Sequence, residues 1–236
     1  TEVDTLSLHA ALPIGGGAGV SSAPPPPPRR GRYLRRPLRV LVACAQPWQA
    51  SLGAGAAAAV PGAGWAAELA ARGHVVTLLY FLHEPREAGF PEFRALAGEL
   101  RAAGVDVDVR NGTGHYYMHS LVAQSYEAHA WLADHALSGL PAFDVVHFAG
   151  GGGLGYYAGL AHRQAPAGAA GRAALVGSVG EPLLLQRERQ GRGAAPRSVD
   201  EVEVNFIERE GARLLDHALV GSRDTLAWCR ERGRAL

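Results

Sequence analysis

Short apolar runs alternate along most of this chain with longer segments whose apolar residues recur at helical spacing. The runs are bounded by glycine, proline or charged residues, a pattern typical of strands buried on both faces of a parallel sheet. We predict six such strands, at residues 38–44, 74–81, 105–109, 144–148, 173–178 and 217–221.

The segments between these runs predict helices. Gly73 suits the left-handed position that follows a helix, and Ser222 is a favourable residue for capping a helix start. We predict one helix ending at residues 72–73 and others at residues 91–103, 119–137, 154–164, 199–216 and 222–232. Strands that alternate with helices indicate βαβ units with right-handed crossovers. The predicted fold class is therefore α/β, with a doubly wound, mostly parallel sheet of the Rossmann-like type.

The first 36 residues have a different composition. They contain three consecutive glycines at residues 15–17, five consecutive prolines at residues 24–28 and several arginines, with little periodic apolar content. This composition predicts a disordered leader, residues 1–36, followed by one folded domain, residues 37–236. Serine and arginine in a leader are typical of organelle transit peptides, whereas Glu2 and Asp4 are not. The predicted location is intracellular, in the cytoplasm or in a plastid.

Composition excludes several classes of function. The net charge is +1 over 236 residues, which gives no reason to expect a nucleic-acid partner, and no apolar run has the length of a membrane span. The sequence contains no lysine, which excludes a P-loop lysine and a Schiff-base lysine within it. Cys44 and Cys229 lie far apart in sequence, so we expect a reducing compartment and no disulfide framework.

The segment at residues 143–157, F-D-V-V-H-F-A-G-G-G-G-L-G-Y-Y, is the strongest candidate for a site. It joins a predicted buried strand to a glycine-rich turn and then to a helix. Ligands of open α/β sheets bind in the crevice at the carboxyl ends of the strands, where this turn lies. We therefore predict that Gly150, Gly151, Gly152 and Gly153 allow a ligand to approach the backbone.

Two other glycine pairs are weaker candidates. Gly53 and Gly55 fit the pattern G-x-G-x-x-A, but they do not directly follow the first strand, and the second strand ends in apolar residues instead of an acid. A flexible loop explains them better than a dinucleotide site, and we expect them to line the same rim. Gly62 and Gly64, just before a helix, could offer backbone N–H groups to an anion.

Ser178 and Glu181 follow at the end of the fifth predicted strand. The segment V-G-S-V-G is not a nucleophile elbow, because Val176 stands where glycine is required. Ser178 then fits a small strand-end residue, and Glu181 either an acid–base group or an exposed carboxylate. His115 and His119 lie four residues apart, but no third ligand accompanies them. We predict neither a metal site nor a bound cofactor, and we assign no catalytic residue.

Six segments, taken in order and spacing, resemble the N-terminal domain of GT-B glycosyltransferases of the retaining, starch- and glycogen-synthase-like group, family 4 and its neighbours. They are A-A-E-L-A-A-R-G-H-V-V-T-L-L (66–79), F-D-V-V-H-F (143–148), G-L-G-Y-Y (153–157), L-A-H-R-Q (160–164), V-E-V-N-F-I-E-R-E (202–210) and L-V-G-S-R-D-T-L-A-W (219–228).

This resemblance implies a hexosyltransferase half-domain. In that family the first Rossmann-like domain holds the carbohydrate acceptor, while a second domain binds the nucleotide-sugar and carries an E-x7-E signature. The single glutamate pair at that spacing here, Glu84 and Glu92, lies in the first half of the chain. The resemblance therefore implies a fragment without its C-terminal donor domain, which uses a nucleotide-sugar as co-substrate only when joined to one.

The chain departs from the family at two places. Relatives show H-F-H-[DE]-W-Q-G-L-G-Y-Y, where this sequence has Ala149 followed by three glycines, and they carry a G-T-H-like turn where this sequence has Val179 in place of the histidine. Valine neither titrates nor donates a hydrogen bond. The alternative prediction is therefore a non-catalytic module that binds carbohydrate or pairs with an active subunit.

Overall fold

A computed structural model describes residues 36–45, 62–82, 88–111, 118–151, 153–165, 171–193 and 195–232. The chain divides into two units, residues 1–35 and 36–236, and all described residues belong to the second. The predicted disordered leader, except for Arg36, therefore lies outside the described residues. So do Gly53, Gly55, Gly152 and His115.

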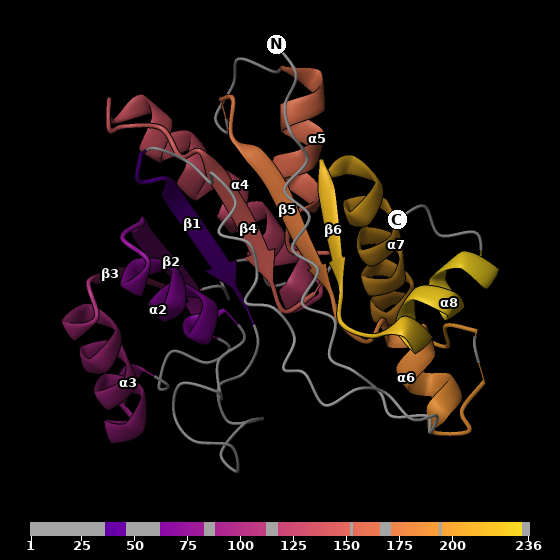
Figure 1. The fold of residues 1–236 in the computed structure, drawn as a ribbon. Helices are drawn as coiled ribbons and strands as arrows, with labels where there is room; N and C mark the ends of the chain where they lie inside the picture. Colours follow the sequence, from indigo (N-terminus) through magenta and orange to yellow (C-terminus); the bar gives the residue numbers. More distant parts are fainter. Residues whose placement is uncertain are drawn as a thin grey trace, which may run out of the picture. The chain divides into compact units, whose positions relative to one another are not determined.

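The described residues form one six-stranded sheet in the order β3-β2-β1-β4-β5-β6 (Figure 1). Every neighbouring pair is parallel. The strands are β1 (Arg39–Cys44), β2 (Val75–Leu82), β3 (Val105–Asn111), β4 (Val145–Ala149), β5 (Ala174–Val179) and β6 (His217–Val220). The doubly wound α/β fold is thus confirmed, and the sheet is parallel throughout.

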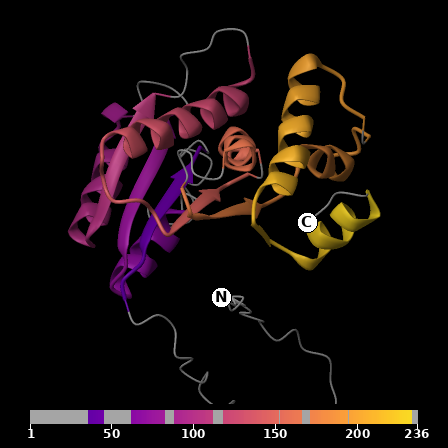
Figure 2. The same ribbon diagram turned by 90° about the horizontal axis from the view of Figure 1, so that it is seen from above.

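Helices lie on both faces of this sheet (Figure 2). One cluster of buried side chains joins α2 and α3 to one face of the strands, and another joins α4 and α5 to the opposite face. The helices are α2 (Ala63–Ala71), α3 (Pro91–Ala102), α4 (Ser120–Leu137), α5 (Tyr156–Gln164), α6 (Leu183–Arg189), α7 (Val199–Leu214) and α8 (Arg223–Glu231). The predicted elements match within a few residues, except that α6 was not predicted.

Strands β1 and β2 are the most completely buried strands of the sheet. Side chains of β1 alternate between the two clusters, with Val40 and Val42 toward α2 and α3, and Leu41 and Ala43 toward α4 and α5. From the second residue onward, every position of both strands is buried. Burial on both faces explains why these strands read as continuous apolar runs in the sequence.

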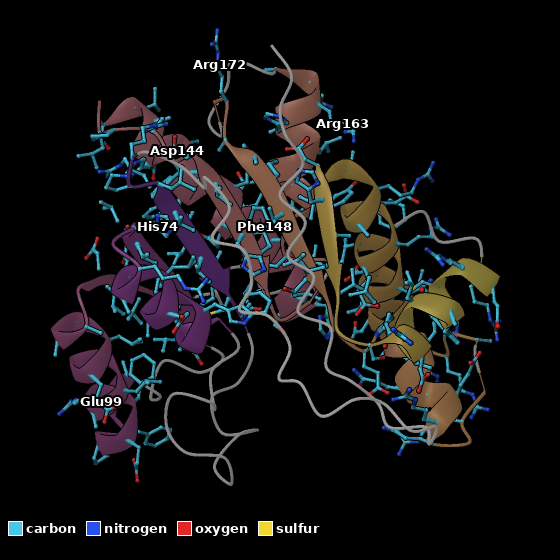
Figure 3. All side chains as sticks on the ribbon, viewed as in Figure 1. His74, Glu99, Asp144, Phe148, Arg163 and Arg172 are labelled. Carbon is cyan, nitrogen blue, oxygen red and sulfur yellow. The ribbon has the colours of Figure 1, made fainter. Side chains whose placement is uncertain are left out.

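Polar side chains fix the starts of the strands, at the sheet edge opposite their carboxyl ends. Asp144, just before β4, accepts hydrogen bonds from the backbone N–H of Arg39 at 2.8 Å and from the Arg36 side chain (Figure 3). His74, just before β2, accepts one from the backbone N–H of Leu38 at 3.2 Å. These contacts set the register of β1 against both neighbours and leave the other edge free for a site.

Among the described residues, no helix combines the length and the apolar character that crossing a membrane requires.

Candidate functional site

The strand order places a topological switch point between β1 and β4. From β1 the chain continues toward β2 and β3 on one side, and from β4 it continues toward β5 and β6 on the other. Cys44 pairs with Ala149 at the carboxyl ends of the two central strands. Ligands of doubly wound sheets bind in the crevice that opens at this point.

Gly62 fixes the start of α2 directly above this point. It caps the helix with a φ of 96°, and a Cβ added to it would lie 2.9 Å from Val42 Cγ1 and 3.0 Å from Ala149 Cβ. A residue with a side chain would be strained in its backbone and would also collide with both central strands. The sequence suggested that the backbone N–H of Gly62 could bind an anion. The structure adds a packing reason for glycine at this position.

The glycine turn after β4 combines open and crowded positions. Gly150 has a φ of 94°, and a Cβ on Gly151 would meet nothing within 4 Å. In contrast, a Cβ on Gly153 would lie 2.8 Å from Ile207 Cγ1, and one on Gly155 would lie 2.7 Å from Phe148. The first part of the turn is therefore open to a ligand, whereas the second part lets α5 start close to α7 and to the sheet.

A stacked polar cluster lies beside the switch point on the α2 face of the sheet. His147, on β4, is only 6% exposed, and its Nε2 lies 2.8 Å from Ser178 Oγ on β5. The indole of Trp65, on α2, stacks on the imidazole with ring centroids 4.6 Å apart and planes 17° apart. This packing holds the imidazole in one orientation toward Ser178.

The imidazole of His147 is neutral near pH 7. Burial lowers its pKa from 6.5 to about 4. A neutral imidazole carries one N–H donor and one ring-nitrogen acceptor, so Nε2 either donates to the Ser178 hydroxyl or accepts from it. The pair can therefore present Ser178 as a hydrogen-bond acceptor or donor to a ligand hydroxyl at the half-exposed side of β5.

Sequence reasoning missed His147 and Trp65 as site residues. The available signal was the register: His147 pairs with Val176, so Ser178 is the next residue of β5 on the same face. A histidine inside an apolar strand beside a serine on the neighbouring strand is such a signal. It could not be used before β4 and β5 were known to be adjacent in this register.

Glu181 lies at the same edge of the sheet, after β5. Its carboxylate forms an ion pair with Arg189, and its backbone carbonyl accepts a hydrogen bond from the Gln186 side chain at 2.7 Å. Both Gln186 and Arg189 belong to helix α6, which the sequence did not predict. These contacts give Glu181 a structural role in fixing α6 against the end of β5, and its contact with a ligand stays a prediction.

Val179 is buried in a small apolar cluster. It is 7% exposed and belongs to a cluster of buried residues that also contains Leu185, Trp228 and Cys229. The Val179 side chain therefore points into packed apolar surroundings. No titratable group is available at this position.

Two further kinds of chemistry find no support among the described residues. Burial raises the pKa of the Cys44 thiol to about 12, so Cys44 is not a thiolate nucleophile at neutral pH although it ends β1 at the switch point. In this part of the chain no three His, Cys, Asp or Glu side chains gather in a way that could hold a metal ion.

Comparison with known proteins adds little to this geometry. No protein-family model and no curated protein matches the sequence. Among solved structures, the chain is similar to a short-chain dehydrogenase from Oenococcus oeni, with a TM-score of 0.38 and 11% sequence identity over 83% of this chain and 85% of that one.

Proposed function

We propose that residues 37–236 form the acceptor-side half of a GT-B glycosyltransferase, which holds a carbohydrate at the carboxyl edge of its sheet. The observation that carries the proposal is the convergence of segments that the sequence resemblance singled out. The segments at residues 153–157 and 202–210 are far apart in sequence, yet a Cβ on Gly153 would lie 2.8 Å from Ile207, and Tyr156 contacts Phe206. The segment at residues 143–148 leads to the same place, because β4 ends at Ala149, at the edge where ligands of this fold bind.

The polar groups at the edge suit sugar hydroxyls. The Ser178 hydroxyl, held by neutral His147, offers a donor or an acceptor, and Gly151 leaves the backbone accessible. A sugar requires several such uncharged hydrogen-bonding groups at close range. Neither the Ser178 hydroxyl nor the His147 imidazole needs to change its charge between about pH 6.5 and pH 8.

A nicotinamide cofactor fits this edge less well. In the dinucleotide fingerprint a tight glycine turn follows the first strand directly, whereas here the first glycine after Cys44 is Gly53. The described end of β2 is apolar, with Phe81 and Leu82 buried. A carboxylate on that strand end would be required to hold the ribose.

A second candidate function is a non-catalytic module that binds carbohydrate or pairs with an active subunit. The burial of Val179 favours it, because the position after Ser178 offers no group that hydrogen-bonds or titrates at a reacting sugar. A carbohydrate-binding module would share the acceptor site and differ from the first candidate only in turnover, whereas a subunit-pairing module would not need that site.

The test combines binding to this chain with turnover after the chain is joined to a donor domain. Calorimetric titration with maltoheptaose should show binding, and Ser178→Ala should weaken it several-fold through the lost hydrogen bond. Transfer from radiolabelled UDP-glucose and ADP-glucose to maltoheptaose, measured after this chain is joined to a C-terminal donor domain of the same glycosyltransferase group, would distinguish the catalytic candidate from the non-catalytic one. Saturable quenching of NADH fluorescence without any oligosaccharide binding would contradict both.

A further inference from the structure

Four aromatic side chains form a continuous shelf across three helices. The rings of Tyr126 on α4, Tyr156 and Tyr157 on α5, and Phe206 on α7 contact one another edge to face. The successive centroid distances are 5.7 Å, 5.0 Å and 5.7 Å, with interplanar angles between 68° and 89°. We call these four residues the aromatic shelf.

The shelf lies at the same edge of the sheet as the glycine turn. Helices α4, α5 and α7 pack against one another on one face of the sheet (Figure 2). Helices α4 and α5 follow the carboxyl ends of β3 and β4, and α7 follows β5 with α6 between them; the shelf residues belong to the first two or three turns of each helix. Tyr156 begins α5 just beyond the glycine turn, so the shelf continues directly from the candidate site.

The shelf is exposed although it is aromatic. Tyr126 is 45% exposed and Phe206 is 43% exposed, while Tyr156 and Tyr157 are half-buried between them. Aromatic rings held by mutual edge-to-face contacts lose little conformational freedom when a ligand binds. The rings therefore offer a preformed apolar surface.

Polar groups accompany the rings. Burial, the neighbouring Tyr156, the Glu203 carboxylate and Tyr126 all raise the pKa of the Tyr157 phenol, so its hydroxyl remains a donor at neutral pH. Glu203 accepts a hydrogen bond from the backbone N–H of His119 at 3.1 Å, which holds its carboxylate beside the shelf. The surface thus pairs aromatic rings with fixed donors and acceptors.

We propose that the aromatic shelf binds the sugar rings of the acceptor chain that lie beyond the unit at the glycine turn. A pyranose ring has an apolar face of C–H groups and an edge of hydroxyl groups. It matches a surface that combines exposed rings with a neutral phenol and a carboxylate. This inference rests on the proposed function, and it extends the acceptor site from the glycine turn onto α4, α5 and α7.

The direct test measures maltoheptaose affinity by calorimetry for the full chain and its variants. Tyr126→Ala and Phe206→Ala should each weaken binding about tenfold, whereas Tyr126→Phe, which keeps the ring, should stay within about twofold. Leu137→Ala is the matched control, because Leu137 is 85% exposed at the other end of the same helix. It should leave the affinity unchanged.

A second measurement does not depend on variants that fold. Nitration of Tyr126 by tetranitromethane, followed by peptide mass spectrometry, should slow when saturating maltoheptaose is present. Unchanged affinity in both alanine variants, or an unchanged nitration rate at saturation, would overturn the shelf and leave the proposed function standing. A wild-type chain that binds no maltoheptaose even at millimolar concentration would overturn both.

The shelf also has an alternative occupant, a second copy of the chain. Val202 on α7 is 53% exposed next to the shelf and could extend a protein interface. Sedimentation equilibrium decides whether a carbohydrate or a second copy of the chain occupies the shelf. A monomer at micromolar concentration supports a carbohydrate occupant, whereas a dimer that Phe206→Ala dissociates would overturn it.

Discussion

The two halves of the sheet are built differently. In β2 every residue from Val76 to Leu82 is buried, because helices cover both faces. In β5 buried and half-exposed residues alternate, and no residue of the short strand β6 is fully buried. The α2 face of the second half is therefore only partly covered, and Ser178 lies on this face beside the buried His147.

The helices of the two halves are also held in different ways. Neither α2 nor α3 has a side-chain cap at its start, and both are anchored by buried apolar residues. In the second half, serine side chains cap α7 and α8, and the buried Arg187 of α6 forms an ion pair with Glu201 of α7. Apolar burial thus anchors the helices of the first half, and polar contacts hold those of the second half, where Ser178 is half-exposed.

The largest expected effect tests this difference in burial. Leu41→Ala should lower the free energy of unfolding by about 2–5 kcal/mol, because Leu41 is completely buried and its removal leaves a cavity. Leu219→Ala on β6, where the leucine is 37% exposed, should cost less than about 1 kcal/mol. Urea unfolding measures both, and equal costs would contradict the comparison.

The next effect tests the close approach of α2 to the central strands. Gly62→Ala should cost about 2–4 kcal/mol, since a Cβ there combines a left-handed backbone with contacts at 2.9 Å and 3.0 Å. Gly73→Ala is the matched control: its φ of 88° is similar, but a Cβ there would meet nothing within 4 Å. It should cost only about 1 kcal/mol. Similar unfolding midpoints for the two variants would show that α2 is not fixed by this contact.

The buried His147 predicts a pH dependence of stability. Its folded pKa is about 4 and its ordinary value is 6.5, so the unfolded chain binds more protons between these values. Stability from the neutral imidazole is complete above about pH 6.5, is lost as the pH falls toward 4, and amounts to at most about 3 kcal/mol.

His147→Gln provides the control for this effect, because it removes the titrating group. The difference in unfolding free energy between wild type and variant should change by about 3 kcal/mol between pH 7 and pH 4. A difference that stays constant with pH would mean that the imidazole is solvated in the folded chain.

The smallest effect concerns the capped helices of the second half. The Ser222 side chain accepts a hydrogen bond from the backbone N–H of Thr225 at 3.0 Å, and Ser198 does the same for Glu201 at 3.2 Å. Each serine-to-alanine change should cost about 1 kcal/mol in thermal or urea unfolding. If neither variant lost measurable unfolding free energy, these caps would not stabilise the second half.

The same difference explains how far the sequence predicted the fold. Strands β1 and β2 are buried on both faces and gave continuous apolar runs, so their limits were predicted within one residue of Arg39–Cys44 and Val75–Leu82. Helix α6 escaped prediction because its seven residues are too few to show helical periodicity and its second half is charged. Local pattern is sufficient where burial decides the structure, and insufficient where polar contacts do.

The candidate site was only partly predictable for a related reason. The glycine turn was found because strand, glycines and helix follow one another in sequence. The pair formed by His147 and Ser178 depends on which strands are neighbours and in which register, and Trp65 reaches it from a third element. Such a long-range combination is set by the folded topology and leaves no local pattern.

We propose that a carbohydrate binds at the carboxyl edge of the sheet, beside the switch point. Amide NMR spectra of the isotope-labelled chain during titration with maltoheptaose test it most directly. The largest shift changes should fall on Gly151 and Ser178 and on the first turns of α5 and α7. Shift changes confined to the opposite edge, around His74 and Asp144, or no changes at millimolar ligand, would contradict it.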